Sequence, residues 1–259
     1  MPDSLPGIIN FRDAGGLPTQ DGRQMVAGRV FRGSGLAVAT DDDLAKIQAL
    51  GIGLIFDLRS LVEATGRPDR LPEGVVYCRQ GAVKAMDETP RESLDWDALI
   101  AQLASSPEAL DESAAFHKQV YAEMIRRPDA FKVLLGELLS NPGRGVYVHC
   151  SAGKDRTGLA CAIVQHLLGV APDVIMANYL ESANHPMPDF AAARDRARAA
   201  GPAVAEVIDL MTGVSRWQLQ SAFDQIETSW GGWDGLTQSG LGLTRDDVAQ
   251  LKADYTTRM

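Results

Sequence analysis

The 259-residue sequence has only three cysteines and lacks both a long apolar run and a basic leader. An odd, low cysteine count argues against a disulfide framework and favours a reducing compartment. Because no run of 18 apolar residues occurs, no membrane-spanning helix is predicted. The first residues, Met1-Pro2-Asp3-Ser4, carry no basic side chain, so no classical signal peptide is predicted. We expect a cytoplasmic protein, and signal-independent secretion stays open.

Positive charge is also scarce, since 25 Lys and Arg face 34 Asp and Glu, for a net charge of −9. This balance argues against nucleic acid or an anionic membrane surface as a partner. A hydrophobic content of 45% suits a sizeable core. Without repeats or linker-like tracts, residues 1–259 are interpreted as one domain.

Short apolar runs at 28–32, 52–57, 75–78 and 146–149 predict strands, separated by helix-like segments. Thr40, followed by three aspartates, is typical of a capped helix start. The alternation predicts an α/β fold with a central, mostly parallel sheet and helices on both faces. Asp57 and Cys150 each end a strand, so we expect both at the carboxyl edge of the sheet.

The segment that follows the last of these strands combines Cys150 with Arg156 around small residues. A tight loop that leads into a helix turns its backbone N–H groups toward one point, and the helix dipole adds positive potential there. Such a site favours a thiolate, and arginine offers a planar fork for two phosphate oxygens. The loop is therefore interpreted as an anion cradle with its own nucleophile.

A nucleotide-binding loop of the form G-x-x-x-x-G-K-[ST] is the rival interpretation of Gly153-Lys154. It requires glycine at position 148 and serine or threonine at position 155. The sequence has Val148 and Asp155 there, so both requirements fail.

The spacing of Cys150 and Arg156 resembles the signature of the cysteine-dependent protein tyrosine phosphatases. The fuller string of residues 149–158, HCSAGKDRTG, resembles the bacterial tyrosine and phosphoinositide branch, called triple-specificity. Four more blocks resemble motifs of that branch and occur in its order. They are Asn10-Phe11-Arg12-Asp13-Ala14-Gly15-Gly16, Val30-Phe31-Arg32-Gly33-Ser34, Asp57-Leu58-Arg59-Ser60 with Glu63, and Gly240-Leu241-Gly242-Leu243-Thr244.

The resemblance implies a protein tyrosine phosphatase-like fold and a role for each loop residue. Cys150 would form a phosphocysteine, Arg156 would bind phosphate oxygens, and the Thr157 hydroxyl would hydrogen-bond the thiolate. The rest of the cradle would come from Ser151, Ala152, Gly153, Lys154 and Asp155. His149, Arg59, Arg12 and Asp13 would support the loop, the last three through fixed ion pairs. The alternative for these three is a direct contact with substrate. No metal or cofactor is implied.

The general acid that protonates the leaving group is less clear, because no Trp-Pro-Asp occurs. Asp155 is the first candidate, since the bacterial branch carries aspartate there. The alternative is that Asp155 only pairs with Lys154 or Arg59. Asp57 and then Asp87 follow as candidates.

Three further expectations concern the surroundings of the loop. Lys154 matches a lysine that phosphoinositide phosphatases use for a second phosphate, whereas Ser151 stands where some of them carry another lysine. Residues 85–127 are expected to form a helical lid insertion. Cys78 and Cys161 are interpreted as core residues, and protection of an oxidised Cys150 by either one stays open.

The sequence therefore predicts a phosphatase that acts on phosphotyrosine and releases inorganic phosphate. Activity on phosphoserine, phosphothreonine or phosphoinositides stays open. Two alternatives remain: a pseudophosphatase that binds phosphorylated partners without turnover, and another cysteine-loop enzyme such as a rhodanese or an arsenate reductase.

Overall fold

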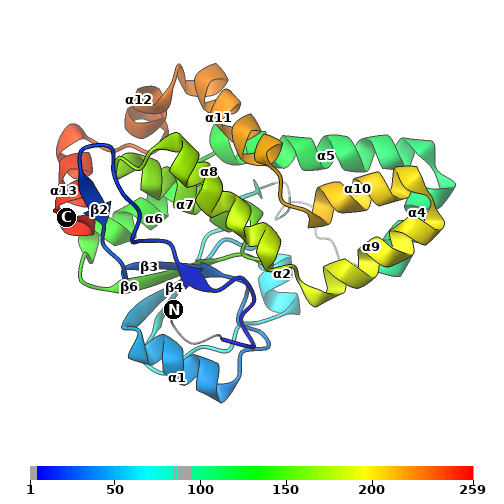
Figure 1. Cartoon of the computed structure of the whole chain (residues 1–259), viewed down its shortest axis with the longest axis horizontal. Coiled ribbons are helices and arrows are strands. Elements are labelled where there is room, and N and C mark those ends of the chain that lie inside the picture. Colours follow the sequence, from blue (N-terminus) through cyan, green and yellow to red (C-terminus); the bar gives the residue numbers. More distant parts are fainter. Residues whose placement is uncertain (1–4, 85, 87–94, 259) are drawn as a thin grey trace.

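A five-stranded sheet forms the centre of the chain in a computed structural model that describes residues 5–84, 86 and 95–258 (Figure 1). The strand order is β1-β3-β6-β4-β5. The pairs β3-β6, β6-β4 and β4-β5 are parallel, and β1 is antiparallel to β3. The strands are β1 (Arg12–Asp13), β3 (Val30–Gly33), β4 (Ile52–Asp57), β5 (Val76–Arg79) and β6 (Gly145–His149). The predicted mostly parallel sheet is confirmed.

Both faces of the sheet are covered, because alternate residues of each strand point to opposite sides. Leu54 and Phe56 of β4 join the main core, whereas Ile55 packs with Ile47 on the other face. The second face is covered by α1 (Asp41–Ala49), and the first by α6 (Asp129–Ser140), α7 (Asp155–Leu167) and α8 (Pro172–Leu180) (Figure 1).

The helix start that Thr40 predicts is confirmed. Thr40 caps α1 by accepting a hydrogen bond from the Asp43 amide, and the Asp43 carboxylate reaches back to the Thr40 amide. Helix α6 ends at Ser140, directly before Asn141-Pro142-Gly143.

Strands β4 and β6 run in parallel and end at the same edge. Asp57 is the register partner of His149, so Asp57 and the residue after His149, Cys150, lie at the carboxyl edge together. That expectation is also confirmed.

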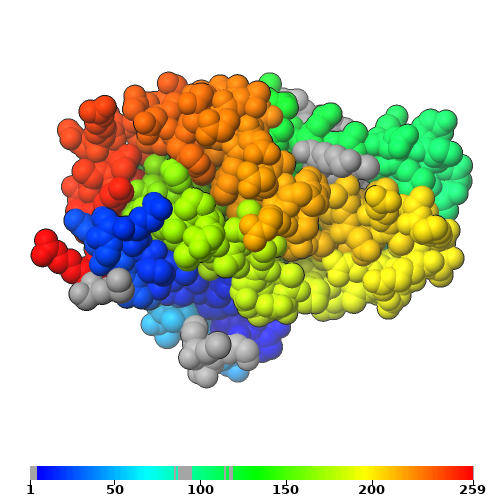
Figure 2. Space-filling model, turned by 45° about the horizontal axis from the view of Figure 1, so that its top comes forward, coloured from blue at the N-terminus to red at the C-terminus, as the bar shows by residue number. Residues whose placement is uncertain are grey.

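Four helices extend sideways from the sheet layers and are called the helical arm (Figures 1 and 2). The arm consists of α4 (Trp96–Ser105), the first half of α5 (Pro107–Arg126), α9 (Pro188–Ala200) and α10 (Pro202–Thr212). It has its own apolar cluster, formed by Ile100, Leu103, Ala109, Ala193, Ala197, Val204, Val207 and Ile208.

The second half of α5 belongs to the main core. Tyr121, Met124 and Ile125 are fully buried there. The predicted lid over 85–127 therefore differs in extent from the helical arm, which also contains α9 and α10. Positions 85 and 87–94 of that prediction, including Asp87, lie outside the described residues. Whether a lid moves stays a prediction.

The remaining elements close the main body around the first face of the sheet. A small antiparallel pair joins β2 to β7. These elements are β2 (Arg23–Met25), α2 (Leu61–Gly66), η1 (Glu181–Asn184), α11 (Arg216–Trp230), α12 (Trp233–Gly235), η2 (Leu236–Gly240), α13 (Arg245–Tyr255) and β7 (Thr256–Arg258). Among the described helices, none has the length and apolar content to span a bilayer.

Candidate active site

The loop between β6 and α7 carries Cys150, which is buried at the end of its strand. Gly153 gives the loop its turn, with a φ of +68°, and an added Cβ would come within 2.2 Å of the Gly33 carbonyl oxygen. The Gly153 carbonyl accepts hydrogen bonds from Asn10 at 2.8 Å and Arg32 at 2.9 Å. Because N–H and C=O point in opposite directions across a peptide, these bonds turn the Lys154 amide away from Asn10 and Arg32.

Arg156, at the start of α7, forms a two-point ion pair with Glu63 of α2. Nη1 lies 2.6 Å from Oε2 and Nη2 lies 2.8 Å from Oε1. Ser151 donates a hydrogen bond to the same carboxylate at 2.7 Å. Glu63 thus fixes both ends of the cradle, Ser151 and Arg156.

Charge and burial act in opposite directions on this pair. Burial disfavours the Glu63 carboxylate, but the charge and hydrogen bonds of Arg156 outweigh it and hold the Glu63 pKa well below its usual range. Burial likewise opposes the Arg156 charge, and Glu63 reverses this effect and raises the Arg156 pKa. Both groups are therefore charged at neutral pH.

Asp155 is held at both carboxylate oxygens. Tyr121 donates to Oδ1 at 2.6 Å, and Lys154 Nζ lies 3.3 Å from Oδ2. The side chain is 18% exposed, so it keeps a face toward solvent. The alternative in which Asp155 pairs with Lys154 is thus present in the structure, and a catalytic role for the same carboxylate remains compatible with this geometry.

Lys154 points toward the helical arm. Its ammonium donates to the carbonyls of Met211 and Gly213, both at 2.8 Å, in addition to the ion pair with Asp155. Since a lysine ammonium has three N–H donors, these partners account for all of them. This arrangement does not favour the expected contact of Lys154 with a second phosphate.

The hydrogen bonding of Thr157 differs from the expectation. Its hydroxyl is buried and makes no hydrogen bond to any residue that the structure describes, so the bond to the Cys150 sulfur implied by the resemblance is not formed here. The hydroxyl belongs to the first turn of α7, where the helix fixes its position. It stays a candidate donor for a charged sulfur.

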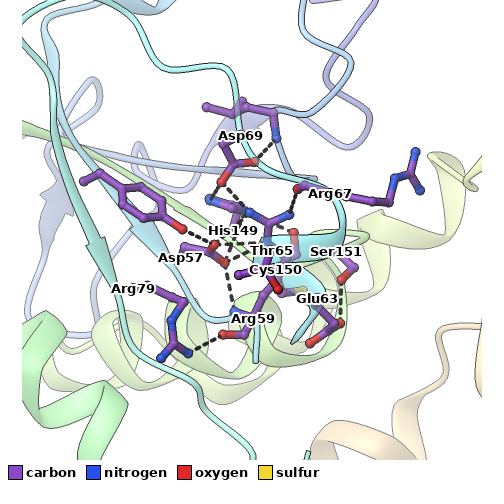
Figure 3. A network of polar contacts seen from close by, with 12 residues as sticks. Asp57, Arg59, Glu63, Thr65, Arg67, Asp69, Arg79, His149, Cys150 and Ser151 are labelled. Atoms are coloured by element: carbon purple, nitrogen blue, oxygen red, sulfur yellow. Dashed lines mark hydrogen bonds and ion pairs between the residues drawn. The ribbon is translucent and has the colours of Figure 1, made fainter. Parts of the chain in front are cut away.

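Asp57 lies inside an ion-pair network beneath the loop (Figure 3). Arg59 donates to both oxygens of Asp57, at 2.8 to 3.0 Å, and to Asp69 at 2.5 Å. Tyr77 donates to Asp57 at 2.7 Å. Burial raises the Asp57 pKa, but the charges of His149 and Arg59 outweigh it and lower the pKa overall. A buried carboxylate that stays ionised is a poor proton donor, so this geometry favours Asp155 over Asp57 as the acid.

His149 supports the loop from the same network. Its Nδ1 lies 3.1 Å from the Cys150 carbonyl, and its ring stacks on Tyr147. Donor atoms of Asp57, Asp69 and His149 lie within 4.8 Å of one another, as in a metal site. The Arg59 guanidinium bonds both carboxylates, so a cation of the protein already balances their charge.

The expected ion pairs of the supporting residues are found for Arg59 only. Arg12 instead donates to neutral oxygens of Asn10, Asn178 and Ser182. Burial, together with the charge of Arg32, lowers the Arg12 pKa to about 9. Asp13 accepts from two backbone amides, those of Gly15 and Gly28, and burial raises its pKa. The difference arises because these side chains fix backbone turns.

The two other cysteines are free thiols. Cys161 is fully buried on α7, whereas Cys78 is half-buried on β5. Burial raises the pKa of both. Each packs with the main core, as expected, and protection of Cys150 by either one stays a prediction.

Sequence reasoning missed several partners of the loop, because they lie far away in the chain. Glu63 falls in a motif without an assigned role, and its Ser60-x-x-Glu pattern is also that of a helix capping box. Asn10 and Arg32 bind the loop from behind, and both fall in the motif blocks. Ser182, which lies outside these blocks, accepts hydrogen bonds from both of them. The spacing of apolar residues around Tyr121 predicts a helix, but it does not predict the contact of the Tyr121 hydroxyl with Asp155.

Comparison with known proteins identifies the family of the chain. A profile of the tyrosine phosphatase family matches residues 4–257. A Cupriavidus necator protein named as a putative tyrosine-protein phosphatase is 33% identical, over 96% of this chain and 86% of that protein. The triple specificity protein phosphatase PtpB of Mycobacterium tuberculosis is 34% identical, over 69% of this chain and 68% of its own.

A solved structure, the core catalytic domain of the PP-IP phosphatase SIW14 from S. cerevisiae, has a TM-score of 0.34 and 14% identity, over 64% of this chain and 78% of that one. The family profile covers nearly all of the sequence, including the Cys150 loop and the blocks that resemble the family's other motifs. The chain is a protein tyrosine phosphatase and belongs to the tyrosine phosphatase family.

Proposed function

We propose that this phosphatase hydrolyses phosphotyrosine through a phosphocysteine formed on Cys150. The observation that carries the proposal is the loop geometry, with Cys150 at the end of β6 and Arg156 fixed beside it by Glu63. An arginine has five N–H donors. Glu63 takes two of them and the Ser151 oxygen accepts a third at 3.4 Å, which leaves two for phosphate oxygens.

In the first step the Cys150 thiolate attacks phosphorus, and the bond from phosphorus to the leaving oxygen breaks. Asp155 gives its proton to that oxygen. In the second step water attacks the phosphocysteine, its proton returns to Asp155, and the S–P bond breaks to release inorganic phosphate and the thiolate. Arg156 and the loop amides stabilise the equatorial oxygens in both steps.

Phosphotyrosine is favoured over phosphoinositides because Lys154 is engaged with Met211, Gly213 and Asp155. A lysine so placed adds little charge for a second phosphate. The triple specificity in the name of the Mycobacterium tuberculosis relative supports a substrate panel that also includes phosphoserine, phosphothreonine and inositol lipids.

The test is hydrolysis of para-nitrophenyl phosphate and of a phosphotyrosine peptide in the presence of EDTA. Cys150→Ser should abolish turnover and still bind inorganic phosphate, whereas Cys161→Ser should retain turnover. Acid quenching during turnover should trap wild-type protein that has gained one phosphoryl group on Cys150.

Phosphate binding by the wild type without any turnover would instead identify a pseudophosphatase. Turnover of thiosulfate or arsenate without phosphatase activity would identify one of the other cysteine-loop enzymes. Either result overturns the proposal.

A further inference from the structure

Tyr121 joins the catalytic loop to the core of the protein through a chain of hydroxyl groups. Its phenol donates to Asp155 Oδ1 at 2.6 Å and shares a 2.7 Å hydrogen bond with the phenol of Tyr179. Since the Tyr121 proton goes to Asp155, Tyr179 is the donor in the bond to Tyr121. Tyr121 and Tyr179 are both almost completely buried. The chain therefore connects the loop carboxylate to α5 and α8.

We propose that Tyr121 is a positioning residue for the general acid, which orients the Asp155 carboxyl group and sets the pH range in which it is protonated. This inference rests on the proposed function, because it takes Asp155 as the acid. It adds a residue from a helix that the sequence motifs do not mark.

The orientation follows from the two fixed oxygens of Asp155. Tyr121 holds Oδ1 and Lys154 holds Oδ2, so the carboxyl plane has little freedom to rotate. A proton donor must lie within hydrogen-bond reach of the leaving oxygen, and small displacements are costly. The same fixed carboxylate then receives the proton of water in the second step.

The effect on protonation follows from the charges that face Asp155. Lys154 and Arg156 are cations, and Tyr121 and Tyr179 are phenols. Burial, followed by the Asp155 charge, raises the Tyr121 pKa well above its usual value, so Tyr121 keeps its proton and acts as a donor. A donor stabilises the carboxylate more than the carboxylic acid. Loss of the Tyr121 hydroxyl should therefore make Asp155 harder to ionise.

The experiment compares the pH dependence of kcat/KM for phenyl phosphate, whose leaving group needs protonation. The basic limb reports loss of the acid's proton in the free enzyme. In Tyr121→Phe this limb should move to higher pH by about one unit, since a hydrogen bond to a charged group is worth about that much. The maximum rate should fall by about tenfold, because the acid loses its orientation.

Three variants serve as controls. Tyr179→Phe, one step farther from Asp155, should shift the limb by less than Tyr121→Phe. Tyr255→Phe removes an equally buried phenol whose hydrogen bond goes to Leu138, so it should leave the limb in place. Asp155→Asn should remove the limb altogether. A structural role of Tyr121 would lower the amount of folded enzyme without any shift of the limb.

Should Tyr121→Phe fail to fold, 3-fluorotyrosine at position 121 keeps the packing and makes the phenol a stronger donor. It should then move the limb to lower pH. An unshifted limb in either variant overturns the inference. The proposed function fails by a different result, namely an inactive wild type or an Asp155→Asn variant that keeps the limb.

Discussion

Glu63 and Arg156 lie 93 residues apart in the sequence and meet as a two-point ion pair beside Cys150. The carboxylate comes from the first turn of α2, where it also accepts a hydrogen bond from the Ser60 amide. The short helix α2 therefore fixes the position of the Glu63 carboxylate, and Ser151 and Arg156 of the loop bind that carboxylate. This arrangement fixes the direction of the Arg156 guanidinium.

Glu63→Gln should lower kcat for aryl phosphates by about ten- to a hundredfold, because a slightly misplaced Arg156 no longer fits the transition state. Ser151→Ala is the matched control, since it removes a hydrogen bond to the same carboxylate and leaves the ion pair intact. Its kcat should change much less. Steady-state kinetics at neutral pH would contradict the prediction if both variants had the same kcat.

Acid should weaken the fold partly through Glu63. Its pKa in the folded protein is lowered from 4.5, so the unfolded chain takes up a proton more readily as the pH falls. The stability contributed by Glu63 is therefore present above about pH 4.5 and is lost below it. Urea denaturation between pH 7 and pH 3 should show a larger loss in unfolding free energy for wild type than for Glu63→Gln. Parallel curves would exclude this role.

Asp57→Asn should destabilise the protein by about 3–5 kcal/mol, because it leaves Arg59 with less compensation in a buried network. The basic limb of the pH profile should persist in whatever enzyme remains folded, since Asp155 is untouched. Tyr77→Phe, which removes a single hydrogen bond to Asp57, should cost about 1 kcal/mol. Denaturant titrations and the pH profile together test this assignment. Loss of the limb in Asp57→Asn would make Asp57 the acid.

Gly153→Ala should lower kcat/KM by about a hundredfold or more, because the new Cβ would meet the Gly33 carbonyl and displace the loop amides. Gly74→Ala is the control. Gly74 has a φ of +76°, close to that of Gly153, but an added Cβ there meets nothing within 4 Å. It should cost about 1 kcal/mol of stability and little activity. Equal activity of the two variants would show that the contact with Gly33 is unimportant.

Much of the fold was predictable, because its strands and caps carry local signals. The four apolar runs at 28–32, 52–57, 75–78 and 146–149 predicted four strands of the sheet, and Thr40 predicted a helix start. Because Asp57 and Cys150 each end a strand of a mostly parallel sheet, their common carboxyl edge was also predictable. Such features depend on neighbours within a few residues, which sequence patterns record.

The partners of the site were less predictable, because they depend on packing between distant segments. Nothing around Tyr121 indicates that its hydroxyl reaches Asp155, and the spacing of apolar residues there predicts a helix alone. Likewise, the motif lysine Lys154 could be assigned to the loop, but its direction depends on where α10 ends. Side-chain direction was the part that only the tertiary structure provides.

The direction of Lys154 also has a consequence for how substrate approaches. With Lys154 bound to the end of α10 and Arg156 balanced by Glu63, the cradle depends mainly on amide dipoles, which act at short range. A chain with a net charge of −9 then repels a dianion at longer distances. Added salt screens that repulsion, so association with small phosphate esters should become faster as ionic strength rises.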